Sequence, residues 1–172
     1  AIKKSYIPSA VLGFIDIHKN KIIQSKGHRQ LFPSKKLVNN KTTFDLASLT
    51  KVIFTTHQIL KLYSKNLIDL NAPIEEYLPD LGQYDYSSWE RKVTIKECLS
   101  HSTHFPAVEP IYTKGNDPMT LKAYILQKRW EKNLPVYSDI NFILLGFILE
   151  RLLKKNIKNI SSGYNFNFKP KG

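Results

Sequence analysis

The spacing of apolar residues changes along this chain, and that change constrains its fold more than any other feature. Residues 10–17 and 21–25 form two β-branched, apolar runs separated by a short polar turn, which predicts a β-hairpin. From Leu49 the apolar residues recur at helical spacing as far as Tyr63, and Asn66 then suits the left-handed conformation that ends a helix. We therefore expect antiparallel strands first and helices after them.

Three further helices are expected from capping signals and apolar periodicity. Residues 94–97 have the spacing of a capping box, and Thr120 precedes another apolar-periodic stretch. A last helix, from about residue 140 to residue 154, is capped by Ser138 or Asp139. Its apolar run is the longest in the chain, but it is interrupted by polar residues and falls short of the roughly 20 residues that a membrane span needs.

Composition favours a globular protein and limits the classes of partner that we expect for it. The chain has 42% hydrophobic and 12% aromatic residues, as globular proteins do. Its formal net charge of +12 suits association with an anionic cell envelope, whereas its basic residues lack the regular aromatic interleaving of a nucleic-acid binder. We expect no specific nucleic-acid partner. The expected location of the protein depends on whether a secretory signal segment was removed from it. If one was removed, we expect the cell envelope; otherwise we expect the cytoplasm.

No metal site and no cofactor are expected from the residue types. Cys98 is the single cysteine, so it has no internal disulfide partner, and it has no Cys or His neighbours at ligand spacing. His101 and His104 form the one close histidine pair, but two ring nitrogens without a nearby carboxylate or thiolate make a weak metal site. Core packing is the expected role of Cys98.

A candidate nucleophile lies at the start of the first expected helix. Ser48 and Lys51 form a Ser-x-x-Lys motif, which puts a hydroxyl and an amine one helical turn apart on the same face. A serine hydroxyl needs a base, and a lysine serves only where its pKa is held down, as the positive end of a helix dipole favours. Backbone N–H groups at that helix end can bind a developing oxyanion. The alternative is that Ser48 caps the helix and Lys51 is solvated.

Four segments together resemble the landmarks of one family. Residues 44–52, Phe-Asp-Leu-Ala-Ser-Leu-Thr-Lys-Val, resemble the active-site helix of the class C β-lactamase-like family, which includes D-Ala-D-Ala carboxypeptidases and certain esterases. Residues 67–79 and 94–102 resemble the next two landmarks of that family. Tyr137-Ser-Asp139 resembles its second catalytic motif, and the four segments follow the family's order.

The resemblance implies a β-lactamase/transpeptidase-like fold of the α/β class (α+β type), with an antiparallel sheet flanked by helices and a helical module. Residues 1–66 would hold the N-terminal hairpin and active-site helix of the α/β module, and residues 67–160 the helical module. Residues 161–172 would form an irregular tail or the start of a missing segment. The family's third motif, Lys-Thr-Gly or His-x-Gly on a strand, is not found. The chain is therefore expected to be incomplete, inactive alone, and poorly soluble or dependent on a partner segment.

Four residues would carry the chemistry by this resemblance. Ser48 would be the acylated nucleophile and Lys51 its base, and Tyr137 would share base duty. Asp139 would contact the substrate, but it stands where lactamase-like members usually have Asn, and an ionised carboxylate only accepts hydrogen bonds. The alternatives are a buried aromatic for Tyr137 and a plain helix cap for Asp139. His101, where the family often has His-Thr-Ser-Gly, is interpreted as structural.

The function implied is that of a serine hydrolase that forms an acyl-enzyme on ester or amide substrates, without a cofactor. A D-Ala-D-Ala-like peptide or a small ester would be the substrate, and simple esters should be turned over better than β-lactams because of Asp139. The alternative is a catalytically silent penicillin-binding-like module for cell-envelope binding, since a fold does not guarantee an activity. The residues indicate no particular oligomeric state.

Overall fold

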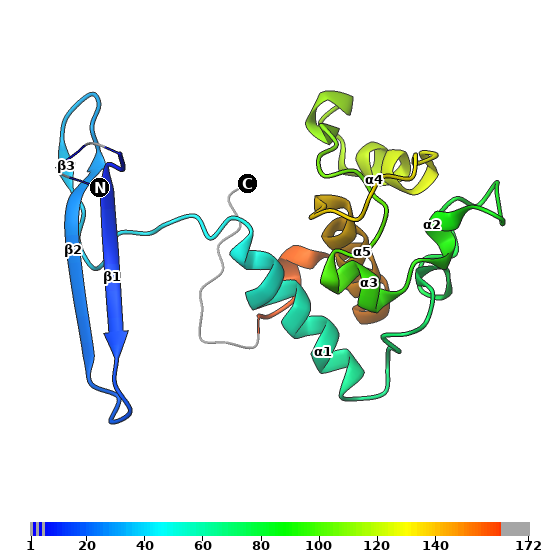
Figure 1. Ribbon diagram of the computed structural model, residues 1–172, viewed down its shortest axis with the longest axis horizontal. Coiled ribbons are helices and arrows are strands. Elements are labelled where there is room, and N and C mark those ends of the chain that lie inside the picture. Colours follow the sequence, from blue (N-terminus) through cyan, green and yellow to red (C-terminus); the bar gives the residue numbers. More distant parts are fainter. Residues whose placement is uncertain (1, 3, 5, 163–172) are drawn as a thin grey trace. The chain divides into compact units, whose positions relative to one another are not determined.

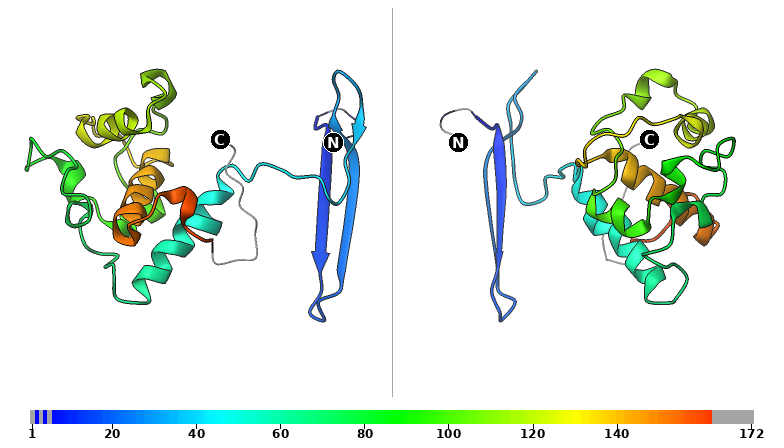
Figure 2. Two further views of the ribbon diagram at one scale, coloured as in Figure 1. Left: turned by 180° about the vertical axis from the view of Figure 1, so that it is seen from behind. Right: turned by 45° about the vertical axis from the view of Figure 1, so that its right-hand side comes forward.

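The computed structural model describes residue 2, residue 4 and residues 6–162. It divides the chain into two units, residues 1–46 and residues 47–172, which Figures 1 and 2 draw from three directions. In its described residues the first unit contains strands, and the second contains helices.

The first unit contains the predicted hairpin. β1 (Ser9–Ile15) pairs antiparallel with β2 (Lys21–Gln30), and the short β3 (Lys36–Leu37) follows, in the order β1-β2-β3. Asp16 closes the turn, because its carboxylate accepts the backbone N–H groups two and four residues later, each at 2.8 Å. The hairpin prediction is confirmed. β3 lies outside the two runs that were predicted as strands, because two residues carry no readable periodicity.

Apolar side chains of this sheet are exposed on both of its faces. The register pairs Phe14 with Ile22, whereas Ile23 pairs with Gly13 and points to the opposite face. Phe14, Ile22 and Ile23 are each more than half exposed. Among the described residues, the strand order leaves the outer edge of β1 unpaired. Such a sheet is stable only when another element covers its apolar faces and its edge.

The second unit is helical. Its elements are, in chain order, the π-helix η1 (Lys51–Thr56), α1 (His57–Tyr63), the 3-10 helix η2 (Ile74–Glu76), α2 (Trp89–Lys92), α3 (Ile95–Ser100), the 3-10 helix η3 (Ile111–Lys114), α4 (Pro118–Gln127), α5 (Asp139–Leu153) and the 3-10 helix η4 (Ile157–Asn159). η1 continues directly into α1, and Asn66 follows with a φ of +57°. The predicted first helix and its left-handed end are thus confirmed.

The starts of two other helices test the predicted caps. The predicted cap of α3 is confirmed, whereas α4 begins earlier than predicted. At α3 the capping box is present, since Thr94 Oγ1 accepts the Glu97 N–H at 3.1 Å and the Glu97 carboxylate accepts the Thr94 N–H at 2.8 Å. At α4 the cap is Asp117, whose carboxylate accepts the N–H of Thr120 at 2.7 Å. α4 therefore begins before Thr120, which lies inside it.

α5 is the centre of the second unit, as Figure 1 shows. It contacts η1, α1 and α3, and its Leu144, Leu145 and Ile148 have no exposed surface. Ile59 of α1 and Cys98 of α3 belong to the same buried cluster. Burial raises the pKa of the Cys98 thiol, which suits the packing role expected for it. Within the described part of the chain, no helix has the length and apolarity to cross a membrane.

The boundary between the two units falls after Leu46, ahead of η1. The resemblance instead grouped this helix with the hairpin, in residues 1–66, and the division of the complete fold into modules stays a prediction. η1 and α1 belong to the second unit here because they pack on α5. η4 follows the last helix that the sequence predicted, and residues 163–172 of the predicted tail lie outside the described residues.

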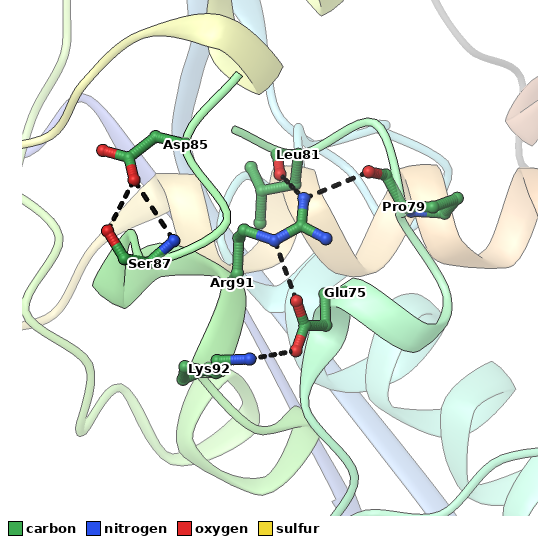
Figure 3. Close-up of polar contacts among 7 residues, drawn as sticks. All are labelled: Glu75, Pro79, Leu81, Asp85, Ser87, Arg91 and Lys92. Atoms are coloured by element: carbon green, nitrogen blue, oxygen red, sulfur yellow. Dashed lines mark hydrogen bonds and ion pairs between the residues drawn. The ribbon is translucent and has the colours of Figure 1, made fainter. Parts of the chain in front are cut away.

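A buried arginine ties the segment after η2 to α2 (Figure 3). Arg91 Nε donates to a carboxylate oxygen of Glu75 at 2.8 Å, and its Nη1 donates to the carbonyls of Pro79 at 3.1 Å and Leu81 at 2.5 Å. Lys92 pairs with the other oxygen of Glu75 at 2.5 Å. Hydrogen bonding first to Lys92 and then to Arg91 lowers the pKa of Glu75. The network holds the irregular segment in place without regular secondary structure.

Candidate active site

Ser48 opens the helical stretch that continues as η1. The residue before it, Ala47, has a φ of +44°, which is uncommon for a residue with a side chain and is the kind of strain found at functional sites. The Lys51 N–H donates to the Ser48 carbonyl at 3.1 Å, which forms the first turn. The Lys51 side chain then reaches back, and its Nζ donates to Ser48 Oγ at 3.2 Å. The hydroxyl and the amine therefore meet.

Lys51 is held as a cation by a residue from another helix. Its Nζ lies 2.8 Å from Oδ1 of Asp139, and its side chain is only 17% exposed, against 57% for Asp139. Although burial works in the opposite direction, hydrogen bonding with Asp139 and then with Tyr137 raises the pKa of Lys51 above its ordinary value. The shift is opposite to the one expected from the helix dipole, because a carboxylate in contact outweighs the partial charge of a helix end.

Tyr137 lies just before α5 and reaches the same hydroxyl. Hydrogen bonding with Ser48 lowers the pKa of Tyr137; desolvation opposes this shift, and Lys51 adds to it. The Lys51 Nζ lies over the Tyr137 ring, 5.3 Å from its centroid. The Tyr137 side chain is half exposed, so it is open to a substrate and is not the buried aromatic of the alternative interpretation.

Asp139 is the first residue of α5, and Ser138 occupies the N-cap position. The plain helix-cap interpretation therefore does not describe Asp139, whose carboxylate is directed at Lys51. Ser138 provides no side-chain cap either, since its hydroxyl donates to the Pro106 carbonyl at 2.6 Å. The negative charge of Asp139 still suits the positive N-terminus of α5.

An open pocket of about 380 Å³ adjoins the Lys51–Asp139 ion pair. Its wall is largely apolar and includes Phe142, Ile143 and Phe147, all on α5. An apolar wall beside a few polar groups is the usual composition of a small-molecule site. The pocket can therefore hold an apolar part of a substrate next to Lys51, which contacts the Ser48 hydroxyl.

His101 is the residue of this site that the sequence reasoning missed. It was interpreted as structural, but its ring stacks on that of Tyr137 with the centroids 4.1 Å apart. Burial, and then the nearby Lys51 cation, lower the pKa of His101. No spacing signal links residue 101 to residue 137, so the sequence alone offered no route to this contact.

The two neighbouring histidines do not form a shared metal site. The Nδ1 of His104 lies 2.6 Å from the carbonyl of Asn133, and His104 packs edge-on against Trp89, whereas His101 faces Tyr137. In the residues that the structure describes, no three His, Cys, Asp or Glu side chains gather as a cation site.

The sequence is similar to proteins of one family over most of its length. The family model described as Beta-lactamase matches residues 4–160. A "Putative D-alanyl-D-alanine carboxypeptidase" from Salmonella agona (strain SL483) is 31% identical over 129 residues, which are 67% of this chain and 30% of that protein. "Protein flp" from Staphylococcus aureus is 26% identical over 163 residues, 90% of this chain and 32% of that protein. The chain thus spans about a third of the length of these curated relatives.

Solved structures show the same fold. A class C beta lactamase from Rhodobacter sphaeroides matches with a TM-score of 0.72 and 23% identity, covering 92% of this chain and 43% of that one. An octameric penicillin-binding protein homologue from Pyrococcus abyssi matches with a TM-score of 0.71 and 18% identity, covering 91% of this chain and 38% of that one. The fold is therefore β-lactamase/transpeptidase-like and of the mixed α/β class, as the resemblance predicted.

Proposed function

Because the chain belongs to the β-lactamase family, a family of serine hydrolases, we propose that it carries the acylation site of an enzyme that cleaves ester or amide bonds through an acyl-enzyme. The observation that supports this function best is the convergence on one hydroxyl, that of Ser48, of the Lys51 ammonium and the Tyr137 phenol. A serine that only caps a helix needs neither group.

Tyr137 is the base that the charges favour. Lys51 has a raised pKa and stays protonated, whereas the pKa of Tyr137 is lowered, which makes its phenolate easier to form. In the proposed step, Ser48 Oγ attacks the substrate's carbonyl carbon while its proton passes to the Tyr137 oxygen. Tyr137 then protonates the leaving group. In deacylation a water attacks the acyl carbon while it gives one proton to Tyr137, and Tyr137 passes that proton to Ser48 Oγ as the bond between Oγ and the acyl carbon breaks. In this proposal Lys51 assists as a fixed cation, and the sequence-based expectation that its amine is the first base stays a prediction.

The proposed substrates are small esters or D-Ala-D-Ala-like peptides. The name of the Salmonella relative supports the peptide, and the apolar pocket wall supports an acyl or leaving group with apolar surface. Asp139 is more than half exposed and ionised beside Lys51, so it repels an anionic group placed next to it. Simple esters should therefore be turned over better than β-lactams, and efficient penicillin hydrolysis would contradict this assignment.

A fluorophosphonate probe tests the proposal in the intact protein that contains these residues. The parent protein should be labelled and Ser48→Ala should not, while the fold is retained. The matched control is Ser64→Ala, which removes an exposed hydroxyl at the other end of the same helical stretch and should leave labelling unchanged. If the parent is not labelled, the catalytically silent binding module becomes the better description.

A further inference from the structure

His101 ends α3 in a conformation that few residues adopt. Its φ and ψ are 54° and 31°, in the left-handed region, and its N–H donates to the Cys98 carbonyl at 3.3 Å. The following N–H, of Ser102, donates to the Glu97 carbonyl at 3.0 Å, which closes the helix end. The backbone thus sets the direction of the His101 side chain from the end of a helix that packs on α5.

The His101 ring lies against two aromatic rings at the start of α5. It stacks on Tyr137 at a centroid distance of 4.1 Å and an interplanar angle of 29°, and it lies 5.0 Å from Phe142 at 34°. Tyr137 lies before the first residue of α5, so its backbone is not part of the helix. Aromatic packing of this kind stabilises one orientation of the phenol.

Hydrogen bonds define the protonation state of His101. Its Nδ1 lies 3.1 Å from the backbone N of Ser138, which donates to it, and 3.3 Å from Nδ2 of Asn141. The Asn141 amide is oriented by Thr103, whose hydroxyl donates to Asn141 Oδ1 at 2.7 Å, so its NH₂ group faces the imidazole. Since two donors face Nδ1, the ring is neutral and carries its proton on Nε2.

We infer that His101 is a positioning residue for the acylation reaction, which holds the Tyr137 phenol against Ser48 and does so only while its own ring is neutral. The inference rests on the proposed function for its effect on rate, but the contact itself is independent of that function. Hydrogen bonds of three residues, His101, Thr103 and Pro106, join the segment after α3 to the start of α5. His101 is the one of these three that touches Tyr137.

Protonation of His101 breaks this arrangement. A proton on Nδ1 would face the N–H of Ser138 and the NH₂ of Asn141, so both hydrogen bonds would be lost. The charged and titratable groups that face the ring are Lys51 from η1 and Tyr137 and Asp139 at the start of α5; Lys51 opposes the imidazolium, whereas Asp139 favours it. Acylation should therefore fall as the pH drops through the His101 pKa.

The test uses His101→Asn, because Asn tolerates the left-handed backbone and keeps a hydrogen-bond acceptor but removes the ring. The matched control is His104→Asn, in the same loop. We expect His101→Asn to lower the fluorophosphonate acylation rate about tenfold to 100-fold, without a change in the probe's half-saturating concentration. The histidine step of the acid limb, which lies below the ordinary histidine pKa of about 6.5, should also disappear, and His104→Asn should change neither.

A second measurement separates this inference from the proposed function. In the unsubstituted protein, the ¹³Cζ resonance of Tyr137 should shift with the titration of His101, whether or not Ser48 reacts with the probe. A protein that is never labelled but shows this coupled titration would refute the hydrolase and keep the contact. A Tyr137 resonance that ignores His101 protonation, or a folded His101→Asn variant with the parent's rate and pH profile, would overturn the inference.

Discussion

The two units of this chain contain similar apolar residues, but these are buried in the core of the second unit and exposed in the hairpin of the first. In α5, Leu144 and Ile148 have no exposed surface, whereas Phe14 and Ile22 in the hairpin are more than half exposed. α5 is covered by η1, α1 and α3 of its own unit, but in the described residues of the first unit the sheet has no helix of its own. An apolar pattern thus shows which face a segment is suited to bury, and a covering element decides whether that face is buried.

The buried ion pair of the second unit should give a large stability effect. Arg91→Leu leaves the carbonyls of Pro79 and Leu81 without their donor and should lower the free energy of unfolding by about 3 kcal/mol. The matched control is Arg151→Leu, which removes a half-exposed pair with Asp80 and should cost less than about 1 kcal/mol. Denaturant unfolding followed by tryptophan fluorescence measures both. Equal costs would show that burial does not strengthen the Arg91 network.

A pair of apolar truncations tests the comparison directly. Leu144→Ala should cost about 2–5 kcal/mol, because it leaves a cavity in the centre of the second unit. Ile22→Ala should change stability by no more than about 0.5 kcal/mol, because the side chain is already solvated. The same unfolding experiment compares them at one temperature. A large cost for Ile22→Ala would mean that the sheet is covered after all.

The acylation rate should depend on side chains of the second unit that contact Ser48. It should not depend on a cationic side chain of the hairpin. In the intact protein, Lys51→Ala and Tyr137→Phe should each lower the acylation rate by about 10²-fold or more, since each removes a group that contacts the Ser48 hydroxyl. Lys26→Ala, on exposed β2, serves as the control and should keep the parent rate. Stopped-flow measurement of probe labelling gives these rates, and normal acylation by Lys51→Ala would remove it from the mechanism.

When residues 1–172 are expressed alone, the two units should differ in their effects on unfolding and on solubility. The second unit has its own core and should unfold cooperatively, whereas the exposed sheet should make the product poorly soluble. Phe14→Thr should improve solubility in this span without moving the unfolding midpoint reported by tryptophan fluorescence. A monomeric, fully active and freely soluble product would contradict the expectation of an incomplete enzyme.

A small effect on stability should come from Asp139→Asn. Asp139 raises the pKa of Lys51, so the pair contributes stability that is present below the unfolded lysine value of about 10.4 and is lost as pH rises through the folded pKa. The variant should therefore be less stable than the parent near neutral pH by less than about 1 kcal/mol, because Asp139 is more than half exposed. The difference should shrink in alkaline solution. A constant difference across the pH range would show that the ion pair is not its source.

The sequence by itself determined the features that depend on neighbours along the chain. The hairpin turn at Asp16, the capping box of Thr94 and Glu97, and the meeting of Ser48 with Lys51 each involve residues no more than four positions apart. Such contacts follow from the repeat of a strand or a helix, and that repeat is visible in the order of residue types. The family resemblance added Tyr137 and Asp139, because their motif stands in the family's order.

Only the tertiary structure decided the charges of the site and the burial of its surroundings. It brought Asp139 to Lys51, which raises the pKa of the lysine, and it laid His101 on Tyr137. A pKa depends on charges and solvent within a few ångströms, and these come from segments whose meeting no local spacing encodes. The same reason holds for the hairpin, since its two apolar runs are equally compatible with a covered sheet and with the exposed one that the structure shows.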